Sequence, residues 1–438
     1  MPSEELSGGD TTVFQNGRNA FGLPIANISR ENRRAHVVGN SFFNKNWVLA
    51  PASTEARDGL GPLFHARSCS SCHTHDGRGR PPEPDELMTS LLIRLSVPGK
   101  TSHGGPIPDP TYGDQLGVRA VPGADPEGNV EISYKEVPGH FSDGSPYTLR
   151  KPILNLVPSG AYPAPKEDVL LSARVAPPVH GLGLLEAVPE KTILSFADPN
   201  DSKSSDGISG RPNWVWNKDT QKEELGRFGW KANQPNLRQQ TADAFLGDIG
   251  ITSPVNPREN FTATQAASLD GLPNGGTPEI DDHLLNRVVT YQQTLAPPAR
   301  RNWTDPSVRH GKQIFHEAGC AKCHIPEMET GDFHPVSELN NQTIRPYTDL
   351  LLHDMGEGLA DHRPDFQASG TEWRTPPLWG IGLTEVVNGH TFFLHDGRAR
   401  NLTEAILWHG GEAEVSREHF RNLPKQERDD LINFLNSL

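Results

Sequence analysis

The sequence predicts a mainly α-helical, loop-rich protein built from two related halves, with a few short β-strands inserted in the first half. Three observations predict this fold class. A Cys-x-x-Cys-His motif occurs twice, at 69–73 and 320–324, and uses all four cysteines of the 438-residue chain. Short phrases recur in one order after each motif, and apolar residues at helical spacing follow them. Finally, 42 glycines and 39 prolines against 34% hydrophobic residues predict many loops.

Cys-x-x-Cys-His is the attachment sequence of a c-type haem. Two thiols one helical turn apart reach the two vinyl groups of a porphyrin, and the adjacent imidazole becomes the proximal ligand of the iron. The motifs therefore predict two covalently bound c-type haems as cofactors. The attachment residues are Cys69, Cys72, Cys320 and Cys323, and the proximal ligands are His73 and His324.

Three other uses of paired cysteines fit less well. A zinc ribbon places its two pairs about 15–20 residues apart, whereas residues 73–319 separate the pairs here. Two separate zinc sites would need finger or knuckle spacing, which neither motif shows. A thioredoxin-like dithiol needs a βαβ setting, and no strand-like run precedes either motif.

Composition limits the function classes. A net charge of −14 without a long acidic run favours solubility, suits a basic redox partner, and argues against nucleic acid and anionic membranes. No apolar run approaches 18 residues, so we expect no membrane-spanning segment. The first residues do not form a signal peptide. Because covalent haem attachment in bacteria is extracytoplasmic, we expect a periplasmic protein whose export signal is absent from this chain.

Along the chain, residues 1–57 are polar and turn-rich and are expected to form an N-terminal extension. Residues 91–97 and 130–134 have the pattern of strands separated by Gly/Pro loops. From about residue 165 the pattern becomes helical. Two later helices are predicted over 284–295, stopped by Pro297 and Pro298, and over 431–438 at the end of the chain.

An internal repeat organises the remainder. Phe64-His65 precedes the first motif as Phe315-His316 precedes the second, and the phrase at 177–186 matches that at 376–385. Lys231-Ala232 with Asn236-Leu237 parallels Arg398-Ala399 with Asn401-Leu402. Three matched blocks in order predict two cytochrome c-like haem domains related by duplication. We place them at 58–300, which includes an insertion, and at 301–438.

Each repeat continues into a helix beside its predicted haem. In the second copy, Asn401 as N-cap and Glu404 three residues later predict a capping box, and Gly410-Gly411 ends the helix just after His409. In the first copy, the apolar face formed by Leu237, Thr241, Ala244 and Phe245 has Gln240 and Asp248 beside it.

These phrases resemble a known family. The residues at 374–379 and 393–398, followed by a helix that ends in His409, are similar to the bacterial di-haem cytochrome c peroxidase superfamily. Within it, the chain resembles the di-haem oxidoreductases sometimes labelled thiol oxidoreductases, through the phrases at 59–64, 181–187, 206–211 and 353–356. The thiol label conflicts with the chemistry, because cysteines used in thioethers cannot cycle as a dithiol.

The resemblance implies a ligand for the C-terminal haem. In the superfamily its sixth ligand, a Met or a Tyr, lies seven residues beyond the Leu that opens the helix. Counting from Leu402 gives His409, which implies a bis-His haem with a lower potential than a His/Met haem. Met355 is the alternative ligand.

For the N-terminal haem, the resemblance implies an iron open to peroxide, a Trp between the haems, and Gln and Glu in the pocket. Trp230 and Gln240 have the expected separation. No Glu occupies the expected position, and Asp248, two residues short, is the nearest carboxylate. Alternatively His75, His103 or His180 closes this iron as a sixth ligand.

Two function classes follow. One is an exported, peroxidase-like oxidoreductase in which the N-terminal haem reacts and the C-terminal haem relays electrons. The alternative is a di-haem electron carrier that serves a partner protein and has no substrate of its own. A further segment, 198–207, gathers oxygen-bearing side chains around turns, which predicts either a Ca²⁺ loop or an ordinary Asp/Asn/Gly turn.

Overall fold

The computed structural model describes residues 4–438 and corrects the predicted fold class. Helices account for 30% of the chain and strands for 19%, so the protein is not mainly α-helical. Two features explain the error. The strands predicted at 91–97 and 130–134 extend to ten and thirteen residues, and their main partners have six and thirteen residues, respectively. In addition, pairs of two- to four-residue strands recur along the chain, and such pairs are too short to show a sequence periodicity.

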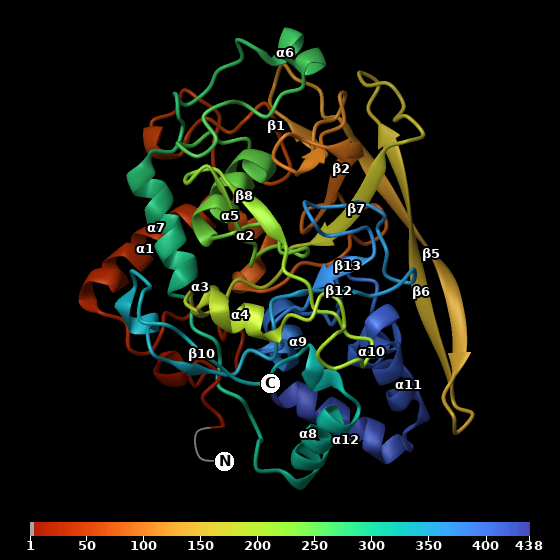
Figure 1. Ribbon diagram of the computed structural model, residues 1–438. Coiled ribbons are helices and arrows are strands. Elements are labelled where there is room, and N and C mark those ends of the chain that lie inside the picture. The colour runs from red at the N-terminus through yellow and green to blue at the C-terminus, as the bar shows by residue number, and fades with distance from the viewer. Residues whose placement is uncertain (1–3) are drawn as a thin grey trace.

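The elements are arranged as shown in Figure 1. The helices are α1 (Arg30–Asn44), α2 (Cys69–Cys72), α3 (Leu182–Glu186), α4 (Glu190–Phe196), α5 (Leu237–Ala244), α6 (Ala263–Leu269), α7 (Asp282–Gln293), α8 (Pro306–Glu317), α9 (Thr384–Asn388), α10 (Leu402–Leu407), α11 (Glu414–Asn422) and α12 (Lys425–Ser437). The strands are β1 (Leu63–Phe64), β2 (Leu91–Lys100), β3 (Pro106–Ile107), β4 (Arg119–Ala120), β5 (Gly128–His140), β6 (Pro146–Pro158), β7 (Leu170–Val175), β8 (Trp214–Asn217), β9 (Lys222–Leu225), β10 (Met328–Glu329), β11 (Thr343–Ile344), β12 (Leu352–Asp354) and β13 (Glu372–Arg374).

The central sheet has the antiparallel order β3-β2-β7. Its register pairs Leu91 with Val175 and Ser96 with Leu170. Leu91, Ile93 and Leu95 alternate along β2 and are buried, which is the pattern of a strand with one face in the core. Leu92 and Arg94, on the opposite face of β2, line the interior cavity.

Strands β5 and β6 form a long hairpin that runs along one edge of the molecule (Figure 1). The hairpin belongs to the first half of the sequence but contacts the second half. Arg150 donates to the carbonyl of Arg398 at 2.9 Å, and Arg421 of α11 donates to the carbonyl of His140 at 3.1 Å. It thus fixes the segment that leads into α10.

Two crossed helix pairs frame the molecule, α1 against α7 and α8 against α12. Each crossing depends on a glycine. A Cβ on Gly39 would overlap the backbone carbonyl of Arg287, and one on Gly311 would overlap that of Asp430. Because only hydrogen occupies these positions, the backbones can approach closely. The long helix that precedes each Cys-x-x-Cys-His motif is therefore packed in the same way.

The predicted helices are found, although the last one begins at Lys425 rather than at residue 431. α7 ends at Gln293, ahead of Pro297, and α12 covers the predicted C-terminal helix. Asn401 caps α10 by accepting from the Glu404 N–H at 2.9 Å. The Glu404 carboxylate, however, accepts from the N–H of Arg400 at 2.9 Å, so only one half of the predicted capping box forms.

The two Pro-Pro segments of the repeat lie against each other. The His180 ring donates from Nε2 to the carbonyl of Trp379 at 3.1 Å, and a Cβ on Gly380 would come within 2.8 Å of the same nitrogen. A Cβ on Gly181 would overlap the Trp379 ring. The halves are therefore in direct contact next to the cavity. In residues 4–438, every helix is too short or too polar to cross a bilayer.

Candidate functional site

One cavity in the protein interior reaches both Cys-x-x-Cys-His motifs. The four cysteines, His73 and His324 all line it, although the motifs are far apart in the sequence. The helix before each motif contributes an aromatic ring beside the histidine. The ring of Phe43 in α1 lies 6.1 Å from that of His73, and the ring of Phe315 in α8 lies 6.4 Å from that of His324.

The three histidines predicted as iron ligands each form the same kind of hydrogen bond, from Nδ1 to a backbone carbonyl. His73 donates from Nδ1 to the carbonyl of Pro177 at 2.7 Å, His324 to that of Tyr347 at 2.9 Å, and His409 to that of Ala405 at 2.7 Å. With the proton on Nδ1, the lone pair of each ring is on Nε2. Metal-bound histidines are usually held through the other nitrogen in this way. Burial also lowers the pKa of His73 and His324 to about 4, which keeps both rings neutral.

The four thiols are free and half-buried, and no disulfide joins them. Burial raises the pKa of Cys69 and of Cys320 to about 12 and raises the pKa of the other two thiols as well. A dithiol redox centre needs a lowered thiol pKa. The surroundings of these thiols therefore disfavour the thioredoxin-like alternative.

His409 and Met355 both line the part of the cavity near His324. His409 follows the end of α10 and lies near His324, whose pKa is lowered mainly by burial and further by the proximity of His409. Met355 lies next to it, since its carbonyl carbon and oxygen approach Gly410. The backbone of Met355 is fixed by a hydrogen bond from its N–H to Thr371. Both predicted alternatives for the sixth ligand are thus present at this site.

Near His73, Asp248 lies on a π-helical turn, Phe245–Ile249, that continues α5. Such turns frequently occur at functional sites. The backbone carbonyl of Asp248 accepts from the N–H groups of His65 and Ala66, which fixes it beside the first motif. Its carboxylate lines the cavity and accepts from Gln115 Nε2 at 2.7 Å. Burial raises the pKa of Asp248.

The structure explains why no Glu follows Gln240 at the expected position. That position is Gly250, whose φ of +72° favours glycine. A Cβ there would lie 2.6 Å from the Cα of Gly61. A side chain cannot fit, and the π-helical turn carries the carboxylate of Asp248 into the cavity instead.

Trp230 and Gln240 line the same cavity. Trp230 is buried, and residues from both halves hold it. Its indole donates to the carbonyl of Val175 at 2.8 Å, and its own carbonyl accepts from the N–H of Arg374 at 2.9 Å. Gln240, on α5, presents a half-buried amide to the cavity.

These residues fit two haems. Each motif supplies two thiols that are not joined in a disulfide and one imidazole with its lone pair on Nε2, and apolar side chains from both halves line the same cavity. The family model described as "Di-haem oxidoreductase, putative peroxidase" matches residues 3–438. The chain belongs to the di-haem oxidoreductase family. Membership confirms the resemblance seen in the sequence and implies haem cofactors. No curated protein matches the chain.

Of the three histidines proposed to close the N-terminal iron of this di-haem oxidoreductase, only His180 lines the cavity. Its Nε2 already donates to Trp379. His75 lies outside the cavity and contacts Arg18 at 2.9 Å. The exposed ring of His103 stacks on Trp216 at 4.0 Å.

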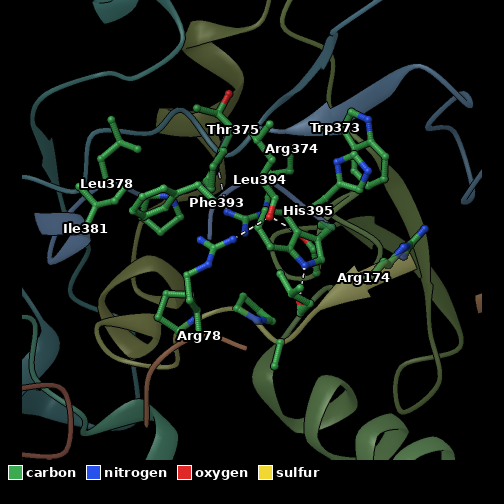
Figure 2. A pocket seen from close by; sticks show the side chains of 18 of the residues that line it. Arg78, Arg174, Trp373, Arg374, Thr375, Leu378, Ile381, Phe393, Leu394 and His395 are labelled. Atoms are coloured by element: carbon green, nitrogen blue, oxygen red, sulfur yellow. Dashed lines mark hydrogen bonds between the residues drawn. The ribbon is translucent and has the colours of Figure 1, made fainter. Parts of the chain in front are cut away.

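Several residues that line the cavity were missed by sequence reasoning. The di-haem oxidoreductase presents Arg78, Arg174, Arg374, Trp373 and His395 around one part of it (Figure 2). The Trp373 and His395 rings stack at 3.7 Å. Arg374 and His395 fall within phrases that carried the family resemblance, which was their only sequence signal. Arg94 also lines the cavity, and Gln115 donates a hydrogen bond to Asp248. Neither residue had a sequence signal.

The predicted calcium loop at 198–207 uses its carboxylates locally. Asp198 accepts from the N–H groups of Ser202 and Lys203, and Asp201 from those of Asp206 and Gly207. Among residues 4–438, no group of three His, Cys, Asp or Glu side chains is arranged to hold a metal ion. These bonds describe an Asp-capped turn.

Proposed function

We propose that this di-haem oxidoreductase is a peroxidase-like enzyme with a reactive N-terminal haem and an electron-relaying C-terminal haem. The observation that carries the proposal is the single cavity lined by both haem motifs, with Trp230 in its wall. Two haems bound in the same interior cavity can exchange electrons directly, without a solvent-exposed step.

The reaction is H2O2 + 2 H⁺ + 2 e⁻ → 2 H2O, with both electrons taken from a redox partner protein. When bound, the haems supply the iron redox chemistry for the two electrons. The protein must provide protons, polar contacts for peroxide, and a route between the two sites.

Asp248 is the proposed proton donor at the N-terminal site. A donor must be protonated at working pH, and burial raises the pKa of this carboxyl. Gln115 orients the carboxyl through the 2.7 Å hydrogen bond. The amide of Gln240 is a second polar group at the same cavity, suited to a hydrogen bond with peroxide.

Trp230 is the proposed electron route. The hydrogen bonds from its indole to Val175 and from Arg374 to its carbonyl attach it to both halves. A ring fixed in this way keeps one position relative to each haem site, which favours reproducible electron transfer.

The C-terminal haem is proposed to be closed by His324 and His409, with Met355 as the alternative to His409. Both histidines have Nδ1 bonded to a carbonyl and the lone pair on Nε2. A haem with two protein ligands has no position for peroxide, which suits an electron relay.

The wider proposal is covalent c-type attachment in two related domains, 58–300 and 301–438, after an N-terminal segment 1–57. The matching crossings of α1 with α7 and α8 with α12 support a duplication, and because α1 lies within 1–57, the first copy would include part of that segment. Covalent attachment in bacteria occurs outside the cytoplasm, so we infer a periplasmic enzyme. Its charge of −14 favours a basic redox partner. Calcium is not included, because the loop at 198–207 spends its carboxylates on backbone amides.

The test combines attachment with reactivity. Intact mass should exceed that of the chain by two haems, and acid–acetone should leave the colour with the protein. Peroxide should rapidly change a high-spin signal, and Trp230→Phe should slow the later response of the second haem. Trp216→Phe is the matched control, because Trp216 does not line the cavity.

Two results would contradict the proposal. Colour that leaves with the solvent would exclude covalent attachment. Two irons that are six-coordinate in every redox state and inert to peroxide would instead identify an electron carrier that serves a partner.

A further inference from the structure

Two guanidinium groups at the cavity, those of the half-buried Arg78 and the buried Arg374, form no ion pair with a carboxylate of residues 4–438, although Asp396 and Asp349 lie close enough to raise their pKa values. Arg78 donates from Nη2 to the carbonyl of Leu394 at 2.6 Å, and its Nε is buried without a hydrogen bond to any residue of 4–438. Arg374 donates from Nε to the carbonyl of Gly229 at 2.9 Å and from Nη1 to that of Thr375 at 3.3 Å. Burial lowers the pKa of each to about 10, and both remain charged.

Other buried cations nearby are paired. Arg174 lies 3.0 Å from Asp365 and Lys231 lies 2.8 Å from Asp361, while Arg398 contacts Asp396 at 2.7 Å. A buried charge without a counter-ion is strongly unfavourable. Arg227 is also held by backbone carbonyls alone, but it does not line the cavity, whereas Arg78 and Arg374 do and are therefore candidates to bind a negatively charged group there.

Both guanidiniums lie beside the proposed relay residue. The Arg78 guanidinium lies over the Trp230 ring at 5.5 Å and over the Phe393 ring at 5.6 Å. The Arg374 guanidinium donates from Nε to the carbonyl of Gly229, the residue before Trp230, and the Arg374 backbone N–H donates to the carbonyl of Trp230. Figure 2 shows the two arginines turned toward the same part of the cavity. Both arginines therefore line the cavity next to Trp230.

We propose that Arg78 and Arg374 form a carboxylate clamp that binds haem propionates at the wall between the two haem sites. The inference rests on the proposed function only in requiring both haems. An Arg fork matches the two oxygens of a carboxylate, and a propionate is the carboxylate that each haem brings into this cavity. In the clamp, the Arg78 guanidinium over the Trp230 ring would be neutralised by the propionate.

The clamp has a defined electrostatic effect on the irons. A guanidinium offsets the propionate charge, and that charge favours oxidised iron. Removing the guanidinium should therefore lower the midpoint potential of the haem that it serves. It should also raise the pKa of the propionate, so that the potential becomes pH-dependent. The other ionisable groups facing Arg78 are Asp396 and His390, and Arg374 faces Asp349.

The test is redox titration of the haem-loaded enzyme at pH 6 and pH 8. Arg78→Gln and Arg374→Gln should each lower one midpoint potential and introduce a pH dependence that the native enzyme lacks. Arg78→Lys keeps the charge and should retain a potential close to native at both pH values, even where a Gln variant loses haem. Arg227→Gln is the matched control, since Arg227 is buried, donates to backbone carbonyls and does not line the cavity.

Three outcomes would overturn the clamp. Gln variants with native potentials at both pH values would show that no propionate depends on these arginines. An Arg78→Lys potential as low as that of Arg78→Gln would exclude a charge effect. A native potential that changes with acetate concentration at fixed ionic strength would assign the site to free anions. Haem content and peroxide reactivity, measured on the same samples, report separately on the proposed function.

Discussion

The hydrogen bonds of the three candidate axial histidines separate ligands from other histidines at this site. His73, His324 and His409 each use Nδ1 for a backbone carbonyl. His180 has the opposite arrangement, with Nε2 bonded to Trp379 and Nδ1 buried without a partner in residues 4–438. Since the proximal ligands of c-type haems follow the cysteines directly, only the sixth ligand needs a mutational test.

Replacing His409 tests the sixth ligand of the C-terminal haem. His409→Ala should convert one low-spin haem to high spin and leave the other unchanged, because the iron loses one strong-field ligand. Absorption and EPR spectra of the purified protein measure this. Met355→Ala is the paired variant, and the assignment is wrong if that change, rather than His409→Ala, opens the iron.

Asp248 provides a test that depends on pH. Asp248→Asn should reduce peroxide turnover by about 10²–10⁴-fold without loss of haem. Because burial raises the pKa of Asp248, the acid form persists to higher pH than usual. The native rate should be highest below that pKa and fall as pH rises through it, and the Asn variant should lose this slope.

The control for Asp248 is Asp243→Asn. Asp243 lies on the same helix, pairs with Lys218 at 2.6 Å, and does not line the cavity. Stopped-flow rates for both variants across pH make the comparison. Equal losses in the two variants would show that the effect comes from the helix and not from the carboxyl.

At the scale of elements, the π-helical turn after α5 and the glycine crossings determine where functional groups lie. The turn brings Asp248 to the cavity although the sequence position expected for a carboxylate is Gly250, packed on Gly61. The crossings place Phe43 and Phe315 beside His73 and His324. Small changes in backbone geometry thus control the distance between each helix and its haem site.

A methyl group at a helix crossing tests this dependence. In Gly311→Ala the new Cβ would overlap the carbonyl of Asp430, so α8 and α12 must separate. We expect a loss of about 1–3 kcal/mol in the free energy of unfolding, the cost typical of overpacking. Denaturant unfolding of the haem-loaded protein measures it.

Gly160→Ala is the control for the crossing. Gly160 is exposed, and an added Cβ meets nothing within 4 Å. Its effect should stay within about 0.5 kcal/mol. If Gly311→Ala is equally neutral, the close approach at the crossing does not contribute to stability.

At the scale of the molecule, the two halves enclose one cavity, and contacts between them hold them together. The β5–β6 hairpin contacts the segment before α10, and the Pro-Pro segments meet through His180 and Trp379.

The first half also contains a buried acid, Glu127, which accepts from the Gly117 N–H and from Gln265. Burial raises the pKa of Glu127 to about 8.

Because Glu127 is protonated in the folded protein, the free energy of unfolding should fall as the pH rises. In the unfolded chain this carboxyl ionises near its ordinary pKa, but in the folded protein it stays protonated until about pH 8. Its favourable contribution is complete below the unfolded pKa and is lost as pH rises toward the folded one. Glu127→Gln should remove a slope on the order of 3 kcal/mol between pH 5 and pH 8.

Thermal and denaturant unfolding at pH 5 and pH 8 make this measurement. The exposed Glu131→Gln, four residues along the chain, is the matched control and should preserve the slope. A native protein that is equally stable at both pH values, with Glu127→Gln unchanged from native, would contradict the assignment.

The sequence by itself determined the family and the haem cofactors, because a c-type motif places its two thiols and its imidazole within five consecutive residues. It also determined helices such as α7, α10 and α12, since a cap and an apolar stripe are local. The tertiary structure decided the remainder. The balance of helix and strand depended on pairings such as β2 with β7 and β5 with β6, whose partners lie far along the chain. The access of Asp248 to the cavity, the unpaired charges of Arg78 and Arg374, and the cavity shared by both motifs arise from segments that meet only on folding. Covalent spacing is a property of neighbours in the chain, whereas burial and charge compensation are properties of neighbours in space.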